Sequence, residues 1–119
     1  MVRSNIPRCG DVYWVDPNPI AGHEIKDRHR FVVITPQQIN ALGVSMVVPI
    51  TTGGAFTRST GLAVAVTGHD TSVAVCNQVR SFDIPARVRA GTARFIETLD
   101  KATMDEIVSR VISAIDPEE

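Results

Sequence analysis

The sequence predicts one small domain of the mainly β (α+β) class, a β-barrel with helices packed on its outside. Three observations support this prediction. Short runs of β-forming residues follow one another with turn residues between them. The hydrophobic period changes near Met104 from that of strands to that of a helix. The chain has 119 residues, 44% of them hydrophobic, which is enough to fill a single core. We therefore expect one domain over residues 1–119.

The first half is expected to hold three strands and one short helix. The predicted strands cover residues 11–16, 30–35 and 44–51, each rich in β-branched or aromatic residues. Pro49 in the third strand marks an edge or a bulge. Between the second and third strands, Thr35 is expected to cap a helix that Pro36 opens and Gly43 ends.

The second half is expected to hold further strands and a terminal helix. Residues 51–61 read as a polar loop, 62–66 and 72–84 as strands, and 87–97 as a hairpin or two short strands around Gly91. From Met104 to Ile115, apolar residues recur at the spacing of one helix face. Asp100 or Thr103 is a suitable cap, and Pro117 ends the helix. We expect it to pack on the sheet rather than bind a partner.

Charge and hydropathy narrow the class of protein. The net charge is −1, but residues 1–99 carry ten cationic and seven acidic side chains, whereas residues 100–119 carry two and six. A mildly basic body weakly favours an anionic ligand. No apolar run is long enough to span a bilayer, and the N-terminal residues lack the apolar segment of a signal peptide. We therefore expect a cytoplasmic protein that does not bind membranes.

The cysteines and histidines indicate neither a disulfide framework nor a metal site. Cys9 and Cys76 are the only two cysteines, and no CxxC or His/Cys spacing typical of zinc is present. Cys76 lies in an apolar run, so we expect it in the core. We expect no metal and no cofactor.

Four segments carry a resemblance to a known family. They are "GDVYWVDPNPIAGHE", "RFVVITP", "VVPITTGGAF" and "VCNQVRSFD", and the likeness extends in order from about Gly10 to Ile115. Together they resemble the MazF/PemK toxins of toxin–antitoxin modules, in particular the ChpB/PemK branch. The resemblance implies a small SH3-like β-barrel of the CcdB/PemK type, a homodimer in most members.

The resemblance also implies a reaction and two partners. The substrate is single-stranded mRNA, cut at a short sequence without a metal, which inhibits translation. The ribose 2′-OH attacks the adjacent phosphate and leaves 2′,3′-cyclic phosphate and 5′-OH ends. The second partner is a cognate antitoxin of the MazE/PemI type, whose acidic C-terminal segment lies in the RNA groove.

Four residues are expected to be catalytic by this resemblance. Arg30 is placed to clamp the scissile phosphate, since a guanidinium binds phosphate in a bidentate manner. Thr51 is placed to donate its hydroxyl to a phosphate oxygen. His23 is a candidate acid or base, and Glu24 is a candidate to orient Arg30 or to read a base edge. His29 has no match in the family, and we expect it at the surface.

A second set of residues is expected to bind RNA. Cationic side chains attract the phosphate chain, glycines permit close backbone approach, and aromatic or amide side chains contact bases. These residues are Lys26, Arg28, Thr52, Gly53, Gly54, Phe56, Arg58, Asn77, Gln78 and Arg80. We expect Trp14 in the core or a dimer interface rather than under a base, because it lies in the middle of a strand.

The sequence departs from the family at two positions that matter for proton transfer. Some members carry an Arg-x-Asp pair on the strand where this chain has Val75 and Asn77, neither of which is an acid or a base. Either His23 and Glu24 handle the protons, or Arg30 does so. Phe31 also replaces the usual proline.

Two other functions compete with RNA cleavage. One is a CcdB-like toxin that binds DNA gyrase without catalysis, but the charged ending "IDPEE" disfavours the apolar chain end that such binding uses. The other is a catalytically inactive RNA-binding barrel, which Val75 and Asn77 keep open.

Overall fold

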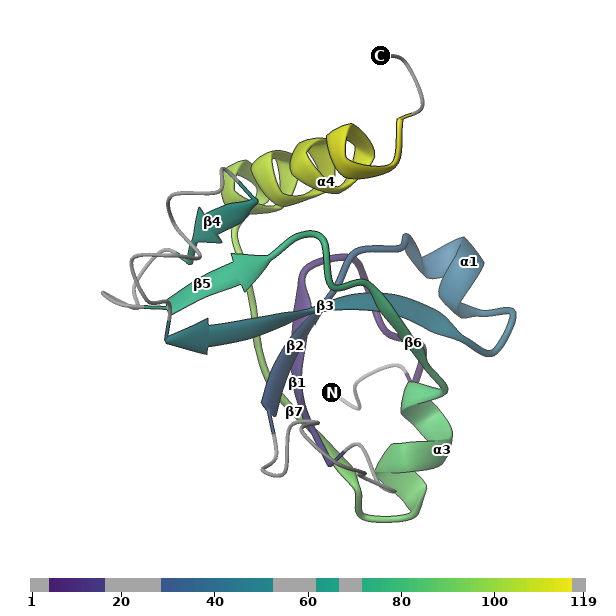
Figure 1. Cartoon of the computed structure of the whole chain (residues 1–119). Coiled ribbons are helices and arrows are strands. Elements are labelled where there is room, and N and C mark those ends of the chain that lie inside the picture. Colours follow the sequence, from purple (N-terminus) through teal and green to yellow (C-terminus); the bar gives the residue numbers. More distant parts are fainter. Residues whose placement is uncertain (1–4, 17–28, 53–61, 67–71, 117–119) are drawn as a thin grey trace.

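The computed structural model describes residues 5–16, 29–52, 62–66 and 72–116 (Figure 1). Within them lie seven strands: β1 (Asp11–Val15), β2 (His29–Val33), β3 (Ser45–Thr52), β4 (Ala63–Ala65), β5 (Ser72–Val75), β6 (Arg80–Phe82) and β7 (Ala93–Thr98). The helices there are α1 (Gln37–Asn40), α3 (Ile84–Arg89) and α4 (Lys101–Ile115), none of them long and apolar enough to cross a membrane. The mainly β class, the short helix after the second strand and the C-terminal helix are confirmed.

The strands pair antiparallel in the order β4-β5-β3-β2-β1-β7. Strand β3 has β2 on one side, and on its other side first β6 and then β5. Pro49 falls in the gap between the β6 and β5 ladders, where a residue without an N–H group is tolerated. Pro49 therefore lies in a central strand, at the point where the pairing on one side of β3 is interrupted, and not in an edge strand. The described strands do not close into a full barrel, because no ladder joins β4 to β7.

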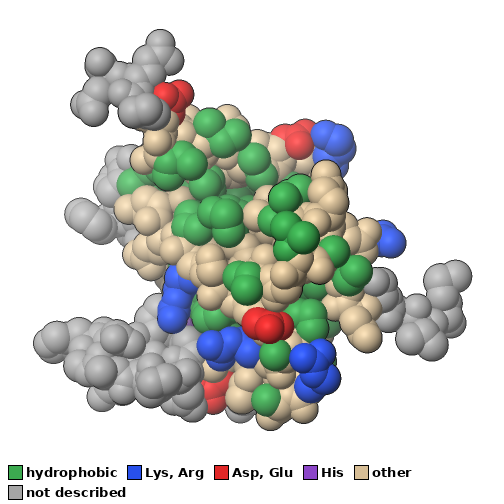
Figure 2. All heavy atoms as spheres, turned by 90° about the vertical axis from the view of Figure 1, so that its right-hand side faces the viewer, with side chains coloured by type: hydrophobic (Ala, Val, Ile, Leu, Met, Phe, Trp, Pro, Cys, Tyr) green, Lys and Arg blue, Asp and Glu red, His purple; other side chains and the backbone are tan. Residues whose placement is uncertain are grey.

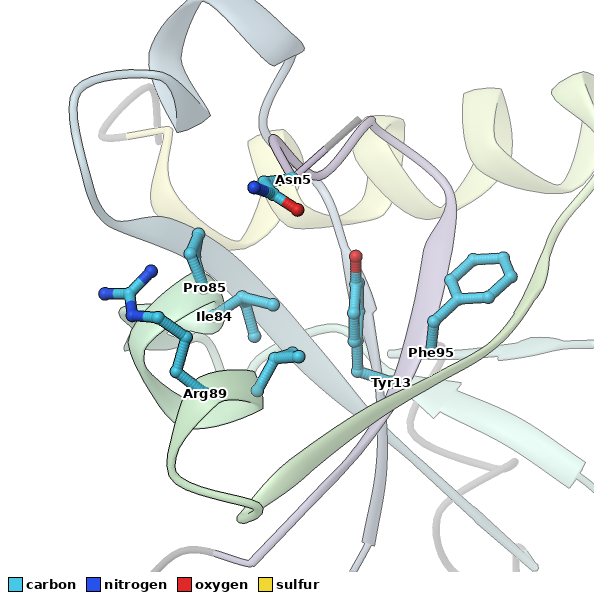
Figure 3. A pocket seen from close by; sticks show the side chains of 7 residues that line it. Asn5, Tyr13, Ile84, Pro85, Arg89 and Phe95 are labelled. Atoms are coloured by element: carbon cyan, nitrogen blue, oxygen red, sulfur yellow. The ribbon is translucent and has the colours of Figure 1, made fainter. Parts of the chain in front are cut away.

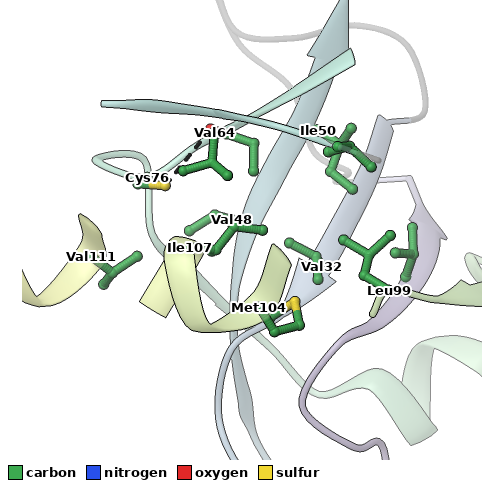
Figure 4. Close-up of a cluster of buried hydrophobic side chains, with 12 residues drawn as sticks. Val32, Val48, Ile50, Val64, Cys76, Leu99, Met104, Ile107 and Val111 are labelled. Carbon is green, nitrogen blue, oxygen red and sulfur yellow. Dashed lines mark hydrogen bonds between the residues drawn. The ribbon is translucent and has the colours of Figure 1, made fainter. Parts of the chain in front are cut away.

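One face of the sheet packs against α4 (Figure 4). Met104, Ile107 and Val111 of the helix are buried against a cluster that includes Val32 and Val48. Each fully buried side chain of this size contributes roughly 1.5–3 kcal/mol. Of the two predicted caps, Asp100 is the one used, since its carboxylate accepts the backbone N–H of Thr103 at 3.1 Å. The expected packing of the stripe on the sheet is confirmed for its first two-thirds.

The opposite face of the sheet packs against α3, and β6, which pairs with β3 in the sheet, adds Phe82 to the same core. Its core combines Tyr13, Val15, Phe31, Val33, Val47, Phe82, Ile84 and Ala93. Phe31 and Phe82 meet edge to face with ring centroids 5.1 Å apart. This aromatic contact attaches β6 to the centre of the sheet.

The predicted hairpin over residues 87–97 is wrong in its first half, which belongs to α3. The Asp83 carboxylate accepts the N–H of Ala86 at 3.0 Å, and Pro85 lies in the first turn. Both are helix-start signals, and here they outweigh the β-forming Val88. Gly91 follows the helix with a φ of 77°, a conformation that favours glycine. Only the second half of the segment is a strand, β7.

The predicted N-cap at Thr35 is also wrong. Pro36 occupies the cap position of α1 without a side-chain hydrogen bond. The Thr35 hydroxyl instead donates to Oδ1 of buried Asn40 and accepts the N–H of Met46 at 3.1 Å. The Asn40 amide donates to the carbonyls of Pro7 and Thr35. α1 is therefore held in place by contacts of Asn40 at its C-terminal end. Sequence spacing alone does not reveal these contacts.

Candidate active site

Several strand ends meet at one rim of the sheet. Because neighbouring strands are antiparallel, β1 and β3 end at the rim where β2 and β5 begin. The rim-side residues include Val15, Arg30, Thr52 and Ser72. Two catalytic candidates, Arg30 and Thr51, are brought to this rim from strands that are neighbours in the sheet.

Arg30 lies in a row of cross-strand partners on one face of the sheet. It is opposite Trp14 on β1 and Ile50 on β3, and the other partner of Trp14 is Arg94 on β7. Directly opposed residues share a face, so two guanidinium-bearing side chains flank the half-buried indole. This arrangement gives the rim a positive character on the side of Arg30.

The guanidinium of Arg30 is held by a residue that the sequence did not single out. Nη2 of Arg30 donates a hydrogen bond to Oγ of Ser72 at 2.8 Å. Ser72 is 5% exposed and opens β5, whereas Arg30 is half-buried. The Arg30 side chain therefore has a fixed partner at the rim.

Thr51 and Thr52 lie on different faces of the sheet. Thr52 is opposite Ser72, and Arg30 is opposite Ile50, two residues before Thr52 on β3. Because side chains alternate along a strand, Thr52 shares the face of Arg30 and Thr51 points to the other face. A ligand seated on the rim itself can be contacted from both faces.

A second cationic group lies on the face opposite Arg30. The guanidinium carbon of Arg87 is 4.6 Å from the ring centroid of Phe82, and that of Arg80 is 5.1 Å from the same centroid. Arg80 also lies 5.9 Å from the ring centroid of Phe31. Nη1 of Arg87 donates to the backbone carbonyl of Asp16 at 3.1 Å, and stacking on the ring leaves the other N–H groups of the guanidinium at its edge. Arg80 and Arg87 therefore form a cationic pair over one buried ring.

The structure does not bring Asn77 and Gln78 to the rim. Ser72 is at the rim end of β5, and both residues follow the other end of that strand in an exposed turn. At about 3.3 Å per residue, the strand separates them from Ser72 by roughly 15 Å. Their neighbour Cys76 is buried in the cluster beneath α4. Within one chain, these two residues belong to a different surface from Arg30.

The remaining predicted site residues lie outside the described part of the chain. They are His23, Glu24, Lys26, Arg28, Gly53, Gly54, Phe56 and Arg58. Residues 17–28 connect the rim ends of β1 and β2, and residues 53–61 follow the rim end of β3. Among the described residues, no three His, Cys, Asp or Glu side chains are grouped so that they could hold a metal ion.

A separate cavity of about 190 Å³ lies between α3 and the strands β1 and β7 (Figure 3). Its lining includes Asn5, Tyr13, Ile84, Pro85, Arg89 and Phe95. In Figure 3 the Tyr13 ring lies between Ile84 and Phe95, and the Arg89 side chain points away from the cavity. None of these residues was predicted to act on RNA, and the cavity is not part of the rim.

Sequence reasoning missed three residues that the structure brings to the two cationic groups. Ser72 is 42 residues from Arg30 in the chain, and no local pattern signals their contact. The position of Arg94 beside Trp14 is set by the register of β1 and β7, which the sequence does not reveal. The sequence prediction puts Arg87 in a hairpin. The helix-start signal at Asp83 and Pro85 is the information that indicates its true position on α3.

Comparison with known proteins defines the class. A family model described as the PemK-like, MazF-like toxin of type II toxin–antitoxin systems matches residues 8–115. With nearly the whole chain matched, this protein belongs to the PemK-like, MazF-like toxin family.

Individual relatives narrow the position within that family. The chain is 34% identical over 113 residues to endoribonuclease PemK of Escherichia coli, covering 92% of this chain and 81% of the relative. It is 37% identical over 92 residues to the endoribonuclease toxin ChpB of Escherichia coli K12, covering 74% and 79%. Both matches agree with the resemblance to the ChpB/PemK branch.

Solved structures share the fold. MazF of Deinococcus radiodurans superposes with a TM-score of 0.71 at 22% identity, covering 91% of this chain and 94% of that one. A mycobacterial endoribonuclease in complex with its cognate antitoxin superposes with a TM-score of 0.68 at 16% identity, covering 94% and 95%. At these identities the likeness establishes the fold.

Proposed function

We propose that the chain is the toxin of a type II toxin–antitoxin module and acts as an endoribonuclease in the cytoplasm. Its substrate is single-stranded mRNA, cut at a short sequence, so that translation stops. The ribose 2′-oxygen attacks the adjacent phosphorus, the bond to the 5′-oxygen breaks, and 2′,3′-cyclic phosphate and 5′-OH ends result. No metal takes part. The names of the two Escherichia coli relatives support this activity.

The observation that carries the proposal is the fixed guanidinium of Arg30 at the rim. Attack by the 2′-oxygen places additional negative charge on the phosphate oxygens. A guanidinium that is positioned before the substrate arrives stabilises this charge without reorganising. The hydrogen bond to Ser72 supplies that positioning. The hydroxyl of Thr51, from the neighbouring strand, is proposed to donate to a phosphate oxygen.

Proton transfer is assigned to the segment that joins β1 to β2. His23 is proposed as the acid or base, with Glu24 as its partner or as the group that orients Arg30. Val75 is buried and apolar, and Asn77 lies at the far end of β5 from Arg30. Their positions support the view that proton transfer does not run through that strand.

The RNA is proposed to cross the rim, with phosphates meeting cationic groups on both faces. Arg30 and Arg94 serve one face, and the Arg80–Arg87 pair serves the other. Thr52, Gly53, Gly54, Phe56, Arg58, Lys26 and Arg28 are proposed to complete this path. Asn77 and Gln78 fit the path only if a second copy of the chain brings them to it.

A homodimer is proposed because the chain exposes an apolar face (Figure 2). Hydrophobic side chains gather over the part of this view where α1 and the end of α4 lie. We call it the α1–α4 face and define it by Ile39, Leu42, Val44, Met46, Ile112 and Ile115, which are 38–82% exposed. Contiguous apolar patches of this kind mark association surfaces. The second copy is the proposed occupant.

The antitoxin is proposed to bind the same cationic rim. A MazE–MazF complex of Deinococcus radiodurans and the mycobacterial complex share this fold. An acidic peptide presents carboxylates to guanidinium groups much as RNA presents phosphates. Binding of the antitoxin would therefore exclude RNA by competition.

One experiment tests the proposed activity. The purified full-length chain is incubated with a defined single-stranded RNA in excess EDTA, and the ends of the products are identified by mass spectrometry. Cleavage at a short sequence with cyclic phosphate ends is the expected result. RNA that is bound but intact would indicate an inactive RNA-binding protein, and intact RNA together with inhibited DNA gyrase would indicate a gyrase poison.

A further inference from the structure

The contact between Arg30 and Ser72 joins two strands that are not neighbours. In the sheet, β3 lies between β2, which carries Arg30, and β5, which carries Ser72. Adjacent strands lie about 4.8 Å apart, so roughly 10 Å separates β2 from β5, and the Arg30 side chain lies across β3 to reach its partner. The 2.8 Å hydrogen bond therefore fixes an extended side chain at its far end.

Strand register gives the direction of that crossing. Arg30 starts opposite Ile50, and Ser72 is opposite Thr52. The side chain thus runs diagonally over β3, from Ile50 toward the rim. The guanidinium is held at the rim end of this strand, beside the position of Thr52.

A neutral hydroxyl is a suitable group for holding a phosphate clamp. A guanidinium has five N–H donors, and one hydrogen bond to a hydroxyl leaves the positive charge and most of those donors free. A carboxylate partner would compete with phosphate for the same donors. Within the described residues, the Arg30 side chain donates its hydrogen bond to Ser72 and not to an acid.

Fixing this side chain has a kinetic consequence. A free arginine side chain loses rotamer freedom when it is ordered, and this loss costs free energy. If Ser72 orders it beforehand, the ordering does not have to occur during the reaction. Ser72 is itself buried at 5% exposure, so its own position is set by the strand.

We infer that Ser72 is a positioning residue for RNA cleavage, which it serves by holding the Arg30 guanidinium over the rim end of β3. This inference rests on the proposed endoribonuclease activity. Ser72 acts through Arg30 and does not itself contact the substrate. Its loss lowers kcat, while the general electrostatic attraction of RNA, and with it KM, is retained.

The test compares Ser72→Ala with Ser72→Thr, which keeps the hydroxyl, and with Ser45→Ala. Ser45 is a matched control, since it is a buried strand serine at the other end of β3 from Thr52. We expect Ser72→Ala to lower kcat about 10- to 100-fold with KM within about twofold. Ser72→Thr is expected to recover most of the rate, and Ser45→Ala to leave it unchanged. Urea unfolding midpoints of all variants separate these effects from loss of stability.

A double-mutant cycle and a spectroscopic readout complete the test. In an Arg30→Lys background, Ser72→Ala is expected to lower kcat little further, because the two residues act as a unit. An equal loss in both backgrounds, or full activity of Ser72→Ala alone, overturns the inference. The ¹⁵Nε relaxation of Arg30 should report a rigid side chain in the natural protein and a mobile one in Ser72→Ala. If the natural protein cuts no RNA, the proposed function fails, and this relaxation measurement still decides whether Ser72 orders Arg30.

Discussion

Arg30 and Ser72 meet across an intervening strand, with Nη2 of Arg30 donating to Oγ of Ser72 at 2.8 Å. The contact joins the rim ends of β2 and β5, in which Arg30 is the second residue of its strand and Ser72 the first. It places a guanidinium where both faces of the sheet can contribute to a bound nucleotide. The predictions on catalysis and binding below depend on this rim.

Replacing Arg30 by alanine should nearly abolish cleavage. The guanidinium stabilises charge that develops on the phosphate, and loss of one such group typically lowers kcat about 100- to 1000-fold. Stability should change little, since Arg30 is only half-buried. Cleavage of a fluorogenic single-stranded RNA gives the rate. Arg30→Lys keeps the charge but not the bidentate geometry, so its cleavage rate should lie between those of the natural protein and Arg30→Ala. Unchanged cleavage by Arg30→Ala would remove this residue from the site.

Thr51→Val and Thr52→Val form a matched pair that separates the two faces of β3. Both remove a hydroxyl and keep the shape of a β-branched side chain. If Thr51 donates to the phosphate, Thr51→Val should lower kcat about tenfold or more, whereas Thr52→Val should mainly raise KM. Steady-state kinetics on one RNA measures both. The reverse pattern would assign catalysis to Thr52, the threonine that shares the face of Arg30.

The Arg80–Arg87 pair should contribute phosphate contacts rather than catalysis. Arg87→Ala and Arg80→Ala should each weaken RNA binding to a similar degree across sequences. Each should also reduce the slope of log K against log salt by about 1. Fluorescence anisotropy at several salt concentrations gives this slope. Arg110→Ala is a suitable control, because Arg110 lies on α4 and is 3.8 Å from Glu106. Slopes equal to that of the control would place the pair outside the RNA path.

Much of the fold was predictable because its signals are local. The stripe from Met104 to Val111 depends on spacing within one helix, and Asp100 is a cap three residues from the N–H it accepts. The predictions were wrong at the start of α1 and at α3, where one local sequence signal competed with another. Thr35 has the chemistry of a cap, but its hydroxyl is used by Asn40 and Met46. The helix-start residues of α3 were outweighed in the prediction by neighbours that favour strands.

The candidate site was predictable only in part, for a different reason. The position of Arg30 follows from a motif, but its partner depends on the register of three strands, β2, β3 and β5. Likewise, Arg80 and Arg87 become a pair only once β6 and α3 place both over Phe82. Contacts between residues far apart in the chain have no signature in a single sequence.

The α1–α4 face should no longer bind a second copy of the chain when acidic side chains are introduced into it. Leu42, which is 82% exposed, and Ile115, which is 68% exposed, are replaced by glutamate singly and together. Burying an unpaired carboxylate at an interface is strongly unfavourable, so we expect the variants to sediment as monomers at concentrations where the natural protein is a dimer. Val88→Glu, at an exposed position on α3, is the control. A natural protein that is monomeric throughout the concentration range would refute the proposed dimer.

Burial of Cys76 should make stability decrease at alkaline pH. The thiol is fully buried, and burial raises its pKa from 9.0 to about 11. Between these values the unfolded chain has lost the proton and the folded chain keeps it. The free energy of unfolding must therefore fall as the pH rises through this window and be unaffected below it.

The pKa of Cys9 is also raised, chiefly by desolvation, so the comparison is made in a Cys9→Ser background. Urea unfolding at pH 7.5, 9.5 and 10.5 should show a steeper decline with Cys76 than with Cys76→Ala, because every other titrating group is common to both. Parallel declines would mean that the Cys76 thiol ionises as readily in the folded protein as in the unfolded chain.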